Sequence, residues 1–213
     1  MEYVAVVFAI TAGVIGLAGR LPDPRKVKRE LARARIQPIR TLADGAPAVV
    51  RGTVALVDDA TFVVSPLGDR NCVYWLVVYD EVGIGGDYAE LGRVEGTCSF
   101  LLRSDDGTAR IAPDHPRIAL PGRSFSQPIS VLAQTPYNAM TELARRVCRK
   151  PNYPTSWLRV TEYTIEPGQF LTISGWCTRE PDPEASVDVS GYREQLPTRP
   201  VISGSRRARL LIG

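Results

Sequence analysis

Histidine and closely spaced cysteines are what this sequence has least of. The 213 residues include one histidine, His115, and four cysteines at positions 72, 98, 148 and 177, none of them in a CxxC pair. Zinc fingers and RING domains need paired Cys or His ligands a few residues apart, so the sequence excludes both. We expect free, mostly buried thiols, although an even count would allow two disulfides in an oxidising compartment.

Catalytic and cofactor-binding motifs are also missing. His115 stands in a Pro-Asp-His-Pro turn, where a surface role is expected rather than that of a general base. The glycine-rich run at Ile84–Asp87 lacks the GxGxxG and GxxxxGK[ST] spacings and is interpreted as a loop. The acidic pairs Asp58–Asp59 and Asp105–Asp106 fit turns better than metal sites. The sequence therefore predicts no catalytic residue, no metal and no cofactor.

Long helical patterns are scarce. Seventeen prolines and eighteen glycines are spread along the chain, which is typical of a β-rich fold with many turns. We therefore expect a mainly β (α+β) protein, in which an amino-terminal transmembrane helix precedes a β-barrel-like domain with one or two short helices. The expected domains are a transmembrane anchor at 1–19, a basic juxtamembrane segment at 20–40 and the β-rich domain at 41–213.

The run from Tyr3 to Gly19 contains no charged residue. As a helix it would be about 25 Å long, just enough to span a bilayer. A buried core helix or a cleaved signal peptide would be alternatives, but the run lacks a polar stripe and has no positive charge before it. Residues on which the anchor prediction rests are Tyr3, Val7, Phe8, Ile10, Val14, Ile15 and Leu17.

Positive charge is concentrated directly after this run. Residues 20–40 carry eight Arg or Lys against Asp23 and Glu30, whereas residues 41–213 are slightly acidic. The positive-inside rule then predicts a single-pass membrane protein with its amino terminus outside and its main domain in the cytoplasm. No aromatic residue accompanies the cations, so nucleic-acid binding is not expected.

The basic segment has the spacing of a short amphipathic helix after Pro24 that ends before Pro38. Its cations could lie on anionic lipid headgroups, with Arg25, Lys26, Lys28 and Arg29 as the candidate contacts. The alternative is a solvated charge run that only fixes the membrane topology.

Two segments of the soluble part resemble each other without a gap, residues 41–54 and residues 164–177. Each has a turn that leads into a strand, and each has a second glycine seven residues after the first. A glycine inside a strand usually marks a bulge or a barrel corner. The four glycines with expected structural roles are Gly45, Gly52, Gly168 and Gly175. Chance similarity of two turn-and-strand segments is the alternative.

Other strands follow from composition and turns. Cys72–Tyr79 is apolar throughout, which predicts a central strand covered on both faces. Runs at 97–102 and 108–112 flank an Asp-Asp-Gly turn and predict a hairpin. A helix is expected from Thr135 to a stop at Pro151, strand structure from Trp157, and short closing strands at 201–202 and 210–212.

Three segments, at 71–75, 100–113 and 162–175, together resemble the GIDE domain, also called BAM for "beside a membrane". The resemblance covers about residues 37–211 and implies a membrane-anchored β-rich domain for partner recognition. Family members that are ubiquitin ligases have a second membrane span and a RING, and both are missing here. Ligase activity is therefore not expected. In the mitochondrial members the domain lies on the non-cytosolic side, which conflicts with the cytoplasmic prediction above.

The sequence thus favours a membrane-anchored protein-interaction or scaffold module that binds an unknown partner protein and is not an enzyme. The expected contacts are Tyr88, in a loop predicted from Ile84 to Gly92, and Pro181 and Pro183, in a proline-rich loop. A membrane-bound hydrolase or a nucleic-acid-binding barrel with an unrecognised site is the alternative.

Overall fold

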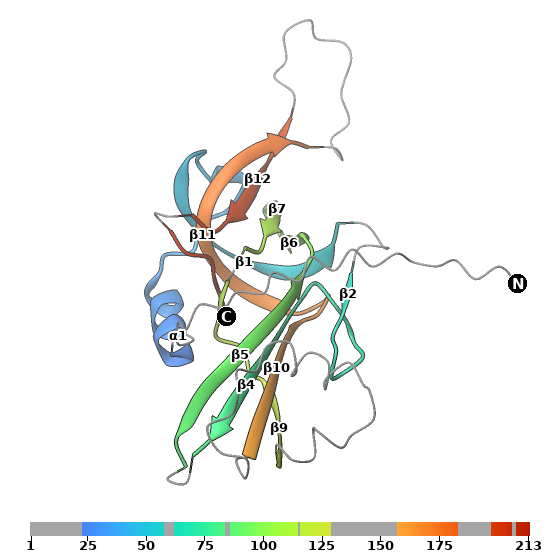
Figure 1. The fold of residues 1–213 in the computed structure, drawn as a ribbon. Helices are drawn as coiled ribbons and strands as arrows, with labels where there is room; N and C mark the ends of the chain where they lie inside the picture. The colour runs from blue at the N-terminus through green and yellow to red at the C-terminus, as the bar shows by residue number, and fades with distance from the viewer. Residues whose placement is uncertain are drawn as a thin grey trace, which may run out of the picture.

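The structure is a computed structural model, and it describes residues 23–57, 62–83, 86–114, 116–128, 157–182, 197–205 and 208–213. Figure 1 shows a curved barrel and a four-stranded sheet that projects from it. The mainly β fold and the barrel-like domain are therefore confirmed. Within the described ranges no helix is both long enough and apolar enough to cross a membrane. The expected anchor at 1–19, the helix from Thr135 and His115 lie outside these ranges.

Five strands form the barrel: β1 (Ala46–Leu56), β6 (Phe100–Ser104), β7 (Gly107–Ala112), β12 (Thr198–Ser203) and β11 (Phe170–Pro181). They are paired in this order, and β11 pairs with β1 to close the ring. All pairings are antiparallel except that of β7 with β12. In chain order the barrel strands are arranged 1-2-3-5-4-1, which is the connectivity of the OB barrel. Closure leaves the barrel without a free sheet edge.

The two repeated segments contain β1 and β11, and these strands pair with each other. Val50 faces Ile173, which is its own counterpart in the repeat, and the register extends on both sides of this pair. A local twofold axis therefore passes through the pair and relates one copy to the other. Each strand also follows a turn whose glycine has a positive φ, 68° at Gly45 and 86° at Gly168. The expected equivalence of the two copies is confirmed in this respect.

The second glycine of each copy lies close to the backbone of a neighbouring strand. A Cβ atom on Gly52 would be 2.4 Å from the backbone oxygen of Arg103 in β6, and one on Gly175 would be 2.7 Å from that of Ser203 in β12. One residue after each glycine, β1 begins to pair with β6 and β11 begins to pair with β12. Only glycine fits these two barrel corners.

The projecting sheet is antiparallel, in the order β5 (Tyr88–Thr97), β4 (Tyr74–Val82), β10 (Trp157–Ile165) and β9 (Arg123–Pro128). Its strands β4 and β5 lie in the connection between β1 and β6, and β9 and β10 lie in the connection between β7 and β11. Two insertions into the barrel therefore combine into one sheet, which extends downward in Figure 1.

Strand β4 is buried on both faces, as its apolar composition predicted. On one face Tyr74, Leu76 and Val78 join the barrel core, which also contains Phe100 and Ile173. The opposite face forms a second cluster from Cys72, Trp75, Val77, Tyr79, Val94, Leu158 and Val160. The barrel and the sheet consequently share one core through β4.

The basic segment contains the predicted amphipathic helix, α1 (Pro24–Arg33). Its buried residues Val27 and Leu31 pack against Ala119 and Leu211. The remaining short elements described are η1 (Ile39–Thr41), β2 (Val63–Val64), β3 (Asn71–Cys72), β8 (Arg117–Ile118) and β13 (Leu211–Ile212). Helix α1 contacts β8, β11 and β13, so it is docked on the β-rich domain rather than separate from it.

Several sequence-based boundaries were wrong. The central strand expected at Cys72–Tyr79 is β4, which begins at Tyr74 and extends to Val82, and Cys72 belongs to β3. The expected loop from Ile84 to Gly92 ends earlier, because β5 begins at Tyr88. The first strand of the predicted hairpin begins at Phe100, and Thr97 instead ends β5. Charged residues and glycines interrupt the apolar alternation of β5, which is an edge strand and does not need it. The closing strands expected at 201–202 and 210–212 are present as parts of β12 and as β13, which begins one residue later than predicted, at Leu211.

Candidate functional site

Two large aromatic side chains are exposed at the far end of the projecting sheet. In the register, Tyr88 of β5 pairs with Val82 of β4, and Val82 pairs with Trp157 of β10. Paired residues of an antiparallel sheet share one face, so the three side chains form a row across the sheet. Tyr88 is 52% exposed and Trp157 is 51% exposed. An exposed aromatic pair of this kind is typical of a binding surface rather than of a core.

A β-bulge decides on which face Tyr88 lies. The pairing of β4 with β5 shifts between Tyr79 and Asp80, which pair with Gly92 and Glu90, so Leu91 is the extra residue. An unbroken alternation would place residues 89 and 91 on this face. The bulge instead brings Glu90 and Tyr88 to the face of Asp80 and Trp157, as bulges re-aim side chains elsewhere.

The charges on this face are paired with one another. Arg159 of β10 binds Oδ2 of Asp80 through Nη2 at 2.8 Å, and its Cζ lies 3.5 Å from the centre of the Tyr88 ring. The second pair joins Arg93 to both carboxylate oxygens of Glu90, at 2.6 and 2.8 Å. Arg159 therefore holds the Tyr88 ring in place by a cation–π contact. We call the surface formed by Tyr88, Trp157 and Arg159 the aromatic face.

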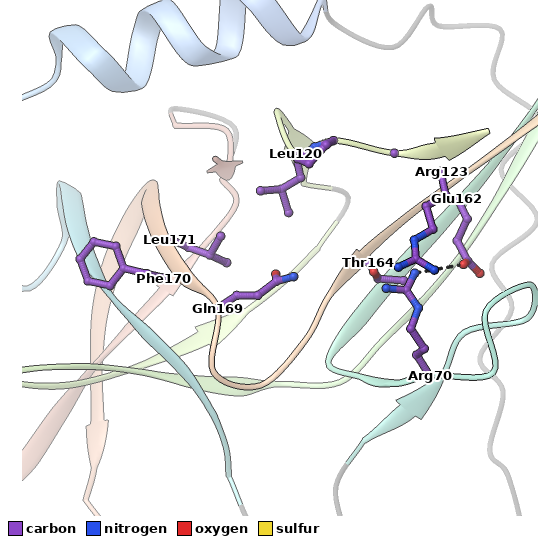
Figure 2. A pocket seen from close by; sticks show the side chains of 10 residues that line it. Arg70, Leu120, Arg123, Glu162, Thr164, Gln169, Phe170 and Leu171 are labelled. Atoms are coloured by element: carbon purple, nitrogen blue, oxygen red, sulfur yellow. Dashed lines mark hydrogen bonds and ion pairs between the residues drawn. The ribbon is translucent and has the colours of Figure 1, made fainter.

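A pocket of about 410 Å³ lies on the other face of the same sheet, next to the barrel. Glu162 of β10 pairs across the strands with Arg123 of β9, and both side chains line it together with Arg70, which follows the β2 strand (Figure 2). The Glu162 side chain is only 1% exposed. It accepts hydrogen bonds from the backbone N–H of Leu67 at 3.0 Å and from Nη2 of Arg70 at 3.5 Å, and Arg70 also binds Glu166.

Charges of both signs lie in and beside this pocket: Arg70, Arg123 and Glu162 line it, and Glu166 forms an ion pair with Arg70. Two polar atoms in it, Nε of Arg70 and Oε1 of Gln169, are buried without a partner among the described residues. Its apolar part is formed by Leu120, Pro121, Phe170 and Leu171. The ion pairs of Arg70 connect the β2–β3 turn to β10 and to the residue after it, so they link the two insertions.

The three cysteines that the structure describes fit the expectation of free, mostly buried thiols. Cys72, Cys98 and Cys177 are free, and Cys72 and Cys177 are buried. Burial raises the pKa of the Cys72 thiol to about 12, and burial also raises the pKa of Cys177. Thiols with raised pKa values are poor nucleophiles. Among the described residues no three His, Cys, Asp or Glu side chains lie together as a metal site would require.

The predicted site residues are found in different surroundings. Tyr88 belongs to the aromatic face, although it lies in a strand and not in the expected loop. Pro181 is exposed and ends β11, where it pairs with Thr198, so the loop predicted there begins after it. Pro183 and all the anchor residues lie outside the described ranges. The four headgroup candidates Arg25, Lys26, Lys28 and Arg29 are exposed on α1.

Sequence reasoning missed the residues that complete the aromatic face and those that line the pocket. Trp157 and Arg159 are separated from Tyr88 by about 70 residues, and only the register brings them together. Their signal was the alternation of polar and apolar residues in β10, which indicates a half-exposed strand. The contact of Arg70 with Glu162 had no sequence signal at all.

Comparison of the chain with family models, with curated proteins and with solved structures gave no match. The resemblance to the GIDE domain therefore stays a prediction from the sequence.

Proposed function

We propose that the protein is a membrane-tethered module that binds a partner protein through the aromatic face of its projecting sheet and catalyses no reaction itself. The observation that carries this proposal is the row of two half-exposed aromatic side chains, Tyr88 and Trp157, at the far end of the sheet. Tyrosine, tryptophan and arginine are the residues most enriched among binding hot spots. The membrane tether and the cytoplasmic location are predicted from the sequence alone, and both are part of this proposal.

The partner that fits this face is an apolar protein segment. Arg159 and Arg93 are already paired with Asp80 and Glu90, so a charged ligand would gain little attraction here. The Tyr88 ring is fixed by Arg159, and little conformational entropy is lost when a partner packs on it. Aliphatic or proline side chains would contact both rings at once.

Nucleic-acid binding is less well supported, although OB barrels often bind oligonucleotides. A shared fold does not carry a function with it. Strands β6 and β7 form the surface that such barrels use, and none of the exposed large hydrophobic residues described lies on them. Arg110 of β7 is paired with Glu180. A stacking surface for bases would need exposed aromatic residues there.

Affinity capture from detergent-solubilised membranes tests the proposal. Full-length protein with Tyr88→Ala or Trp157→Ala should lose the bound partner, because truncation of a hot-spot aromatic costs about 2 kcal/mol, roughly thirtyfold in Kd. Phe170→Ala is the matched control, since Phe170 is 66% exposed on the barrel. Equal recovery of the partner with all three variants, or its loss with Phe170→Ala alone, would contradict the proposal.

A further inference from the structure

Helix α1 presents one apolar and one basic side, and the protein itself uses only the apolar side. Val27 and Leu31 are buried, and they pack against Ala119 and Leu211. The five basic residues of the helix, Arg25, Lys26, Lys28, Arg29 and Arg33, are all exposed. At 100° per residue the cations spread over an arc of about 160°, opposite the two buried residues.

The helix is fixed in place, so its basic side points in one direction relative to the barrel. The Asp23 side chain caps its amino end by accepting the backbone N–H of Arg25 at 2.9 Å, and Pro24 occupies the first turn. Contacts with β8, β11 and β13 then anchor it along the domain. The five cations therefore project from a helix with a fixed position on the domain, and we call this surface the basic side of α1.

The cations of this surface form no ion pair with the acidic side chains that the structure describes. Their one side-chain hydrogen bond among the described residues runs from Nε of Arg29 to the Arg25 carbonyl at 3.3 Å. Glu30 is the single acidic residue of the helix. Clustered like charges repel each other, so an anionic surface outside the protein would stabilise them.

We propose that the basic side of α1 binds the anionic headgroups of the membrane to which the chain is tethered and thereby fixes the orientation of the domain on the bilayer. This inference rests on the membrane location in the proposed function. Because Val27 and Leu31 are used for packing, the helix cannot insert an apolar face as an interfacial helix does. Binding is therefore electrostatic, and it depends on anionic lipid and on ionic strength.

The occupant of this surface is a bilayer and not a nucleic acid, for two reasons. The exposed side of α1 carries no aromatic residue on which a base could stack. The surface also directly follows the segment predicted to cross the membrane, so anionic headgroups are present there at high local concentration.

The test uses full-length protein with a fluorescent amino acid in place of Ala32, an exposed α1 residue. It is reconstituted into nanodiscs of phosphatidylcholine alone or with about one third phosphatidylserine, which carry acceptor dye on headgroups. Energy transfer should be higher in the anionic discs and should fall with added salt. The triple variant Lys26→Glu, Lys28→Glu and Arg29→Glu should lower transfer to the value of neutral discs.

The matched control is Arg51→Glu with Arg103→Glu, two exposed arginines on the barrel, and it should leave the transfer unchanged. Equal transfer in both lipids, or no effect of the triple variant, would overturn the inference. Release of α1 from anionic discs by a short DNA duplex would instead assign this surface to nucleic acid. The triple variant is also tested for capture of the partner protein in detergent. Normal capture together with unchanged energy transfer would refute only the lipid inference, whereas loss of capture in Tyr88→Ala and Trp157→Ala tests the proposed function separately.

Discussion

The barrel and the projecting sheet solve the problem of sheet edges in opposite ways. Closure of β1 with β11 gives each barrel strand two partners. Among the described strands, the projecting sheet ends at β5 on one side and at β9 on the other, and the β5 edge carries a bulge and an exposed tyrosine. In the proposed function the barrel is the scaffold, and the insertions into its connections form the binding surface, as loops on a rigid fold commonly do.

The two parts are nevertheless one folding unit, because β4 contributes Tyr74, Leu76 and Val78 to the core of the barrel. Substitutions in this shared core should affect both parts, whereas substitutions at the aromatic face should affect binding alone. The following predictions test this difference, beginning with the largest effect.

Phe100→Ala should have the largest effect on stability. Phe100 of β6 is fully buried in the shared core, and removal of a buried phenyl ring costs about 3–5 kcal/mol of unfolding free energy. Chemical denaturation should show one cooperative transition at a lower midpoint. The control Phe62→Ala, at a 37% exposed residue, should cost far less. Two separate transitions in Phe100→Ala would show that the barrel and the sheet fold independently.

Gly52→Ala and Gly175→Ala should each cost about 1–3 kcal/mol, because the new methyl group would overlap a backbone oxygen of the next strand. The two losses should be similar, since the glycines occupy equivalent barrel corners. Gly83→Ala is the control at the end of β4, where the nearest atom would be 3.5 Å away. Thermal denaturation of the three variants gives the comparison. A neutral effect at either corner would refute the close-approach account of that strand.

Alkaline pH should destabilise the protein through Cys72. Its pKa is raised from 9.0 to about 12 by burial, so the unfolded thiol ionises first as pH rises. The contribution of the protonated Cys72 thiol to the free energy of unfolding is fully present below pH 9. It is lost as the pH rises from about 9 to 12, and the free energy of unfolding then falls by up to about 1.4 kcal/mol per pH unit. Urea denaturation across this range should show a shallower decline for Cys72→Ala than for the native chain. Parallel declines would mean that the Cys72 thiol is accessible in the folded state.

Tyr88→Ala and Trp157→Ala should have the smallest effects on stability. Each should lower the free energy of unfolding by less than about 0.5 kcal/mol, because both side chains are half exposed. A larger loss, measured by thermal denaturation, would mean that the aromatic face supports the sheet instead of serving as a binding surface.

Local sequence patterns predicted the elements that depend on local physics. The apolar run of β4, the Asp-Asp-Gly hairpin turn, the amphipathic spacing of α1 and the glycines of the repeat were all legible, because composition and turn chemistry determine them. The pairing of β1 with β11 could not be predicted, because it depends on contacts between residues about 120 positions apart in the sequence.

The candidate site was predicted only in part, for the same reason. Tyr88 was selected as exposed, but its strand, its bulge and its neighbours Trp157 and Arg159 follow from pairing across three strands. The charged edge strand β5 lacked the alternation by which strands are recognised, and so Tyr88 was assigned to a loop.

Photo-crosslinking tests the central claim most directly. A photoreactive amino acid is placed at position 157 on the aromatic face or at position 170 on the barrel, both exposed aromatic sites in the native chain. Irradiation of cells that express the full-length protein should give a crosslinked partner protein from position 157 and none from position 170. Crosslinks from position 170 alone, or equal crosslinks from both positions, would contradict the assignment of the barrel as scaffold and of the projecting sheet as binding surface.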